Sequence, residues 1–124
     1  MPTPVVTSFL RHRGAVLLLR RSDAVGSYRG LWGGVSGHVA RDGRDPEAPE
    51  RDPEAAARAE IAEETGLLAD CTLVRAGEPL AVEDPDHGTW RVHPFLFDCA
   101  SRAVTTDAET AETAWGAPPA MLRR

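Results

Sequence analysis

Three glutamates, Glu60, Glu63 and Glu64, stand at helical spacing within a run of strong helix formers. Residues three and four apart are neighbours on a helix, so the three carboxylates share one stripe and repel one another. The run ends at Gly66, so the acids occupy the last turns, where the helix dipole disfavours negative charge. No Lys or Arg follows them at helical spacing. Their placement therefore costs stability and favours the binding of a cation.

The carboxylate oxygens indicate which cation this would be. Hard divalent cations take oxygen ligands, commonly a few carboxylates together with waters and substrate phosphates. The sequence has no Cys or His motif with the spacing of a zinc site. The cluster therefore predicts Mg²⁺, with Mn²⁺ as the other candidate. The alternative is an acidic helix face that is merely solvated, which is the commoner case for an arbitrary helix.

The helix that carries these acids has clear start and stop signals. Asp52 can cap the first free amides, Pro53 suits the first helical position, and Glu54 is favoured there by the helix dipole. Good helix formers follow from residue 55 to residue 64, and Gly66 supplies a left-handed stop. The sequence therefore predicts a helix that begins at Asp52 and ends at Gly66.

The rest of the chain has mostly the patterns of strands. Residues 5–10 and 15–20 are apolar and β-branched around a polar turn that ends in Gly14, which predicts a hairpin. The glycine-rich stretch 21–37 predicts a structured loop or short strands, and the polar stretch 40–52 predicts a solvated surface loop. The remaining predicted strands are residues 72–76, 79–83 and 89–98, the last two joined by a turn-rich linker at 84–88.

One segment resembles the Nudix box, G-x5-E-x7-R-E-U-x-E-E-x-G-U with U aliphatic: residues 60–67, EIAEETGL, preceded by Gly37. The resemblance continues upstream in residues 32–39 and downstream at Trp115, so it covers nearly the whole chain. It implies an α/β fold, the Nudix-type α/β/α sandwich with a mixed sheet between helices. It also implies a Mg²⁺-dependent hydrolase that cleaves a diphosphate linkage in a nucleoside diphosphate derivative by water attack on phosphorus.

The resemblance also assigns roles at the site. It makes Glu63 and Glu64 the principal metal ligands, and Glu60 a further ligand or the base that deprotonates water. It makes the Ser36 carbonyl a backbone ligand. Glu60 and Glu64 are thus the expected catalytic residues, and Gly37 opens the box.

Three further residues are expected on the substrate side of the site. His38 directly follows Gly37 and is expected to face the cleft. Glu83 stands where a predicted strand meets a loop, a common place for an extra catalytic acid. Arg51 is the third, because of a departure from the box described next.

The first half of the box departs from the family pattern. The chain is eight residues longer than the motif between Gly37 and the helix, and in register with Gly66 the motif's first Glu falls on Arg51 and its Arg on Ala59. Arg58 is turned by about 100° from position 59, so it does not replace that Arg. We expect Arg58 to pair with Glu54, four residues earlier, and Arg51 to grip Glu60 from the loop.

Composition limits the remaining function classes. The chain has 124 residues and a formal net charge of −5, which fits one domain over residues 1–124 and argues against a nucleic-acid partner. No stretch is long and apolar enough to cross a bilayer, and the amino terminus lacks the plan of a signal peptide. The cysteines, Cys71 and Cys99, match no metal or redox motif and are expected to be buried, reduced thiols.

These observations predict a cytoplasmic enzyme whose partner is a small, nucleotide-type substrate. The oligomeric state is left open, a homodimer included. The sequence after Trp115 leaves hardly a turn for the helix with which Nudix domains usually end. The expectation is therefore a Nudix-type domain that lacks its C-terminal helix or is a fragment of a longer chain.

Two other functions remain open. Residues 32–39 also resemble the Gly-His stretch of isopentenyl diphosphate isomerase, but that chemistry needs a protonating Cys in the cleft, and neither Cys lies beside a matching motif. A non-catalytic module that senses or docks nucleotides is suggested by Arg51 and Ala59. The intact Glu60, Glu63 and Glu64 speak against it, since such a module has no need of three repelling acids.

Overall fold

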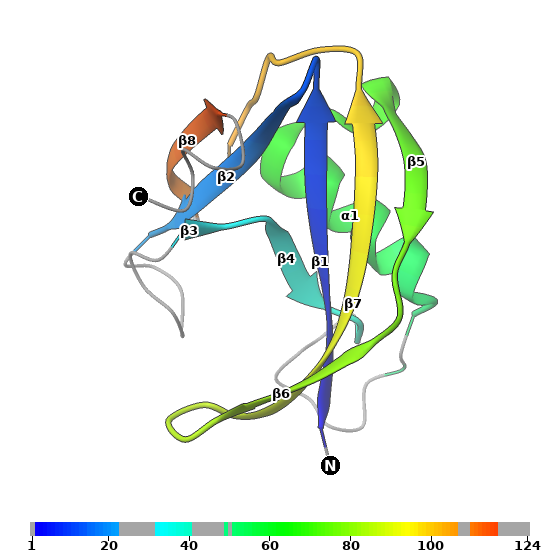
Figure 1. Ribbon diagram of the computed structural model, residues 1–124, viewed down its shortest axis with the longest axis vertical. Coiled ribbons are helices and arrows are strands. Elements are labelled where there is room, and N and C mark those ends of the chain that lie inside the picture. Colours follow the sequence, from blue (N-terminus) through cyan, green and yellow to red (C-terminus); the bar gives the residue numbers. More distant parts are fainter. Residues whose placement is uncertain (1, 23–31, 41–48, 50, 107–109, 117–124) are drawn as a thin grey trace.

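A computed structural model describes residues 2–22, 32–40, 49, 51–106 and 110–116, and within these ranges the strands join in one mixed sheet (Figure 1). The strands are β1 (Thr3–His12), β2 (Ala15–Arg21), β3 (Trp32–Gly33), β4 (Val35–His38), β5 (Cys71–Ala76), β6 (Leu80–Asp84), β7 (Gly88–Cys99) and β8 (Thr110–Gly116). The helix α1 (Pro53–Thr65) packs on one face of this sheet and is followed by a short 3-10 helix, η1 (Leu68–Asp70). The mixed sheet predicted from the sequence is confirmed.

The predicted strands are present, and their ends differ from the predicted ones by at most two residues. β1 and β2 form the expected antiparallel hairpin, whose turn places Arg13 and Gly14 at φ 49 and φ 83. Gly14 adopts this left-handed backbone without strain, because it has no Cβ. The glycine-rich stretch contributes the short strands β3 and β4, and the late Trp115 lies in β8, which pairs with β2.

β1 is the strand that organises the centre of the sheet. On one side it runs parallel to β7, from Thr3 opposite Trp90 to Arg11 opposite Asp98. On its other side it pairs with β4 and then with β2, both antiparallel. β7 in turn pairs antiparallel with β5 and β6, so β5 forms an outer edge of the sheet (Figure 1).

The helix begins and ends as its sequence predicts. The Asp52 carboxylate accepts a hydrogen bond from the Ala55 amide at 3.2 Å, and Pro53 is the first helical residue. Gly66 closes the helix at φ 70, and its amide donates to the Ala62 carbonyl at 3.2 Å. The predicted surface loop before the helix falls mainly on residues 41–48 and 50, which lie outside the described residues.

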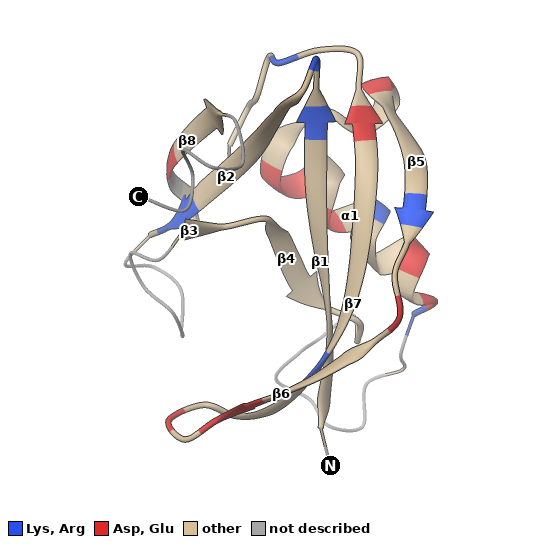
Figure 2. Ribbon diagram, in the orientation of Figure 1, with Lys and Arg blue, Asp and Glu red and all other residues tan. Residues whose placement is uncertain are grey.

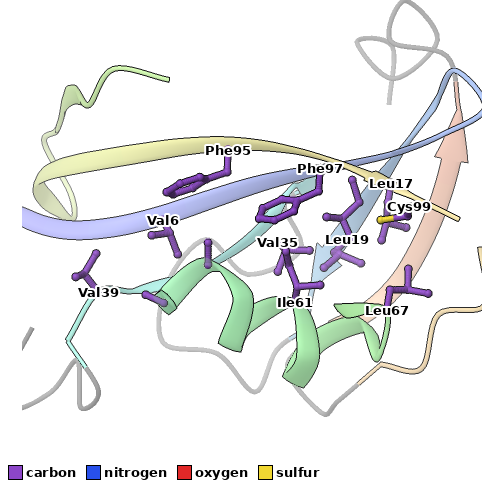
Figure 3. Packing of buried hydrophobic residues seen from close by; sticks show 13 residues of the cluster. Val6, Leu17, Leu19, Val35, Val39, Ile61, Leu67, Phe95, Phe97 and Cys99 are labelled. Atoms are coloured by element: carbon purple, nitrogen blue, oxygen red, sulfur yellow. The ribbon is translucent and has the colours of Figure 1, made fainter. Parts of the chain in front are cut away.

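The hydrophobic core lies between α1 and the sheet. Phe97 of β7, Val6 of β1 and Ile61 of α1 are fully buried there, and Leu67 closes the core beyond the end of the helix (Figure 3). This packing fixes α1 against β1, β4 and β7. It thereby decides which face of the helix turns toward β4.

The second helical layer of the sandwich is not seen in the described ranges, where α1 is the one α-helix. The prediction about a C-terminal helix falls on residues 117–124, outside those ranges. No helix in the described part of the chain is long and apolar enough to cross a membrane.

Candidate active site

Strand β4 packs against helix α1 beside the acidic stripe, which consists of Glu60, Glu63 and Glu64. Gly37 lies in β4 opposite Val6, and its backbone faces the side chain of Glu60. A Cβ added at Gly37 would overlap the Glu60 carboxyl group. The φ of Gly37 is not in the left-handed region, so its backbone conformation does not require glycine. Glycine is needed here because the Glu60 side chain approaches so closely. The glycine that opens the predicted box therefore forms a cradle for Glu60, the first carboxylate of the acidic stripe.

The three acids of the stripe differ in exposure. Glu64 is buried at 6% exposure, the Glu60 side chain is 16% exposed, and Glu63 lies in solvent. The stripe thus turns one edge into the protein and the other outward, and Figure 2 shows the acidic residues along α1. Its members are held at helical spacing by the capped and packed α1.

A metal at this place would have an open coordination sphere. Among the described residues, no three Asp, Glu, His or Cys side chains lie close enough together to enclose an ion. Mg²⁺ is commonly bound through one or two carboxylates, with waters and substrate phosphates filling the other positions. Glu60 in its glycine cradle and Glu64 one turn later supply such a donor set, so the residues present fit a hard cation.

Ser36, whose carbonyl is a predicted metal ligand, directly precedes Gly37 in β4. It lies in β4 opposite Thr7, and the two hydroxyl oxygens are 3.1 Å apart. The Ser36 hydroxyl also donates to the Gly34 carbonyl, with 3.4 Å between the oxygens. The side chain is thus engaged within the sheet, and Thr7 is a neighbour of the site that sequence reasoning missed.

Arg51 joins the end of β4 to the acidic stripe. Its Nε donates to the Val39 carbonyl at 3.2 Å, and its Nη2 donates to the His38 carbonyl at 3.1 Å. The same Nη2 lies 3.9 Å from Oε1 of Glu60, with the two side chains 18% and 16% exposed. The expected contact between Arg51 and Glu60 is therefore present. The hydrogen bonds to two carbonyls, which the sequence did not indicate, fix the guanidinium group.

Arg58 points to another part of the molecule. Its Nε lies 3.1 Å from Oε2 of Glu54, the helical pair expected from the sequence. Its guanidinium carbon lies 5.4 Å from the centre of the Phe97 ring on β7. Arg58 therefore belongs to the helix surface and the packing against β7.

His38 is the last residue of β4, and its own carbonyl accepts a hydrogen bond from Arg51. Its ring meets Trp90 of β7 edge-on, with 6.2 Å between the ring centres. Burial lowers the pKa of His38 below its usual value, and the positive charges of Arg21 and Arg51 lower it further. The imidazole is therefore neutral near pH 7. Trp90 is another residue that sequence reasoning missed, because its place depends on the pairing of β7 with β1.

Glu83 occupies a different part of the sheet. It lies in β6 opposite Thr89, close to the end of the hairpin that β6 forms with β7, and its side chain is exposed. Figure 2 shows the acidic residues gathered at this hairpin tip. The structure thus places Glu83 on a separate element from the Glu60 cradle.

The lowered pKa of His38 predicts a dependence of stability on pH. Below about pH 6.5 the unfolded chain binds a proton that native His38 takes up only at lower pH, so the free energy of unfolding should fall as pH drops. Urea unfolding midpoints measured between about pH 5 and about pH 8 test this. His38→Gln should flatten the curve in this window. Equal slopes in both proteins would show that other groups dominate.

The cradle predicts a large effect of a single methyl group. Gly37→Ala should push the Glu60 carboxylate away from β4 and lower any metal-dependent turnover by about tenfold or more. Gly33→Ala is the matched control, since a Cβ there meets nothing within 4 Å. Steady-state rates of the two variants compare the sites directly. A Gly37→Ala protein as active as Gly33→Ala would show that Glu60 does not need its cradle.

Solved structures share this arrangement of elements. A MutT protein from Methanosarcina mazei Go1 is 23% identical, with a TM-score of 0.73, covering 99% of this chain and 83% of its own. An Ap4A hydrolase from C. elegans, solved as a binary complex, is 19% identical, with a TM-score of 0.76 and coverage of 98% and 84%. The NUDIX domain of Shewanella oneidensis NrtR, solved with ADP ribose, is 18% identical, with a TM-score of 0.71 and coverage of 99% and 77%.

These structural similarities establish the fold. The family is shown by a match between the sequence and a family model. No curated protein is significantly similar to the chain. The family model described as NUDIX domain matches residues 1–123, which include Gly37, Arg51 and the acidic stripe of α1. The chain therefore belongs to the Nudix family.

Proposed function

We propose that the chain is a metal-dependent hydrolase that cleaves a diphosphate linkage in a nucleoside diphosphate derivative by attack of water on phosphorus. The observation that carries this proposal is the placement of Glu60. Its carboxylate lies against Gly37 and near Arg51, one helical turn from the buried Glu64. A fixed carboxylate beside a second one is what binding a hard cation and accepting a proton from water require.

The glutamates of α1 and the backbone of β4 have separate roles in this reaction. Glu60 and Glu64 would hold Mg²⁺ or Mn²⁺, with Glu63 and the Ser36 carbonyl as the further candidate ligands, and the bound metal would supply charge neutralisation of the diphosphate and a lowered pKa of the attacking water. Glu60 accepts the proton from that water as its oxygen attacks phosphorus. The phosphorus–oxygen bond of the anhydride breaks, and the leaving phosphate carries away the electron pair.

The remaining residues position these groups. Arg51 holds Glu60 against β4 and ties that contact to the His38 carbonyl. Gly37 and the neutral His38 line the substrate side of the cradle, and Glu83 is the candidate for an additional acid brought by the β6–β7 hairpin. A nucleotide-type substrate is supported by two proteins of the same fold, one named an Ap4A hydrolase and one solved with ADP ribose.

A non-catalytic nucleotide-binding module is the second candidate. It is favoured by one observation, the ion pair with Arg51, which places a positive charge beside a carboxylate that would otherwise be available to a metal. The isomerase alternative has less support from the structure. It needs a Cys in the cleft, whereas Cys71 and Cys99 face each other across β5 and β7.

The experiment that separates these functions is a screen of nucleotide sugars, dinucleoside polyphosphates, NADH, ADP-ribose and nucleoside triphosphates with Mg²⁺. The hydrolase predicts phosphate-containing products that are lost with excess EDTA. In ¹⁸O-labelled water, one label should enter a phosphate product. Binding without turnover by calorimetry would favour the non-catalytic module. A product of unchanged mass from isopentenyl diphosphate would favour the isomerase.

A further inference from the structure

Cys71 and Cys99 form a cross-strand pair at the edge of the sheet. Cys71 opens β5, Cys99 ends β7, and the two residues are direct partners in the antiparallel register. The Ala100 amide donates to the Asp70 carbonyl at 2.9 Å, just outside the pair. A hydrogen bond between the flanking residues marks a non-hydrogen-bonded pair, in which facing side chains approach most closely.

This geometry is suited to a disulfide. The α-carbons of a non-hydrogen-bonded pair lie about 4.5 Å apart, within the range of about 4.4–6.8 Å that disulfides span. The register already places the two cysteines directly opposite each other. The bond can therefore form without a shift of either strand. The sequence did not predict this pairing of Cys71 with Cys99, because the two residues are far apart in the chain and match no redox motif.

The two thiols are chemically unequal. Cys99 is buried in the core at 6% exposure (Figure 3), whereas Cys71 is only half-buried, so the expectation that both are buried is wrong for Cys71. The interaction between the two thiols lowers the pKa of Cys71 and raises that of Cys99. Cys71 is therefore both the accessible thiol and the better source of a thiolate.

We propose that Cys71 and Cys99 form a reversible dithiol–disulfide site that exchanges with low-molecular-weight disulfides such as oxidised glutathione. The Cys71 thiolate attacks one sulfur of the reagent, the reagent's sulfur–sulfur bond breaks, and one thiolate leaves and takes up a proton. Cys99 then loses its proton and attacks the Cys71 sulfur, which releases the second thiol. Two protein thiols are oxidised, and the reagent is reduced to two thiols.

The second step is helped by the first. Once Cys71 is held in a mixed disulfide, the interaction between the two thiols that raises the pKa of Cys99 is lost. Cys99 is then the direct neighbour of the bond it must attack. The product fastens the edge strand β5 to β7, at a place distinct from the Glu60 cradle on β4 (Figure 1).

The test uses the full chain, reduced and then incubated with mixtures of reduced and oxidised glutathione, followed by acid quench and intact mass. The wild type should lose two hydrogen atoms without a lasting adduct, and peptide mapping should join Cys71 to Cys99. Its melting temperature should rise and return after treatment with dithiothreitol, because the cross-link restricts the unfolded chain. A wild type that stays reduced, keeps a glutathione adduct or forms linked dimers would overturn the proposal.

Single variants show the order of the steps. Cys99→Ala should retain one glutathione on Cys71, since the resolving thiol is gone. Cys71→Ala should react at least about tenfold more slowly, because Cys99 is buried and its thiolate is disfavoured. Equal or faster reaction of Cys71→Ala would overturn the assignment of Cys71 as the attacking thiol. If either variant unfolds, iodoacetamide labelling of the reduced wild type gives the same comparison, with Cys71 labelled first.

Discussion

Glu64→Gln should lower kcat by about two orders of magnitude or more while the protein stays folded. A bound metal contributes several kcal/mol of charge stabilisation to the transition state, and every 1.4 kcal/mol or so is a factor of ten in rate. Glutamine keeps the size of the side chain in its buried position but removes the charge that binds a hard cation. Stability should be unchanged or slightly raised, since the substitution removes an anion from a repelling cluster at the end of a helix.

The measurements are steady-state rates against Mg²⁺ concentration and urea unfolding. Glu63→Gln should also lower turnover, and the protein should stay folded because Glu63 is exposed. Glu54→Gln is the matched control, because it removes a carboxylate from the opposite end of the same helix, where the partner is Arg58. Full turnover in both Glu63→Gln and Glu64→Gln, or turnover that survives excess EDTA, would contradict the metal mechanism.

Arg51→Ala should lower kcat by about tenfold or more, and it should also lower the free energy of unfolding of a protein that still folds. The substitution removes the hydrogen bonds to the Val39 and His38 carbonyls together with the ion pair to Glu60, so the carboxylate loses the group that positions it. A hydrogen bond from a charged donor contributes about 1.5–3 kcal/mol. If the role is positioning, added guanidinium ion should restore part of kcat, and more Mg²⁺ should be needed for half-maximal rate.

Arg58→Ala is the control for a lost guanidinium group. Its contacts are the ion pair with Glu54 and the face of the Phe97 ring, both away from the cradle. The free energy of unfolding should fall by a few tenths to about 1 kcal/mol, and turnover should stay at the wild-type level. A greater loss of turnover in Arg58→Ala than in Arg51→Ala would show that Arg58, not Arg51, supports Glu60.

Local signals predicted the elements well. The Asp52 cap, the first-turn Pro53 and the stop at Gly66 act within a few residues, so the helix and the stripe it carries could be predicted from the sequence. The hairpin around Gly14 is equally local. The register of the acidic half of the box also gave the correct neighbour for Arg51, since the contact with Glu60 is present.

The features that sequence reasoning missed depend on contacts between distant segments. The place of Trp90 beside His38 follows from the pairing of β7 with β1, which no local pattern specifies. The approach of Cys71 to Cys99 follows from the register between β5 and β7. The hydrogen bonds from Arg51 to two carbonyls depend on where the chain enters α1, beside the end of β4. Each is a consequence of packing rather than of spacing along the sequence.

The parallel pairing of β1 with β7 also has a consequence for how the chain folds. The partner of the first strand follows more than 70 residues later in the chain. Closing such a long loop costs conformational entropy before the contacts between the two strands can compensate for it. During synthesis, the β1–β2 hairpin and α1 therefore emerge before the strand that completes the central pairing. We expect folding on a timescale of about milliseconds to seconds, limited by this long-range step rather than by the helix. Until β7 arrives, one edge of β1 stays open to other chains.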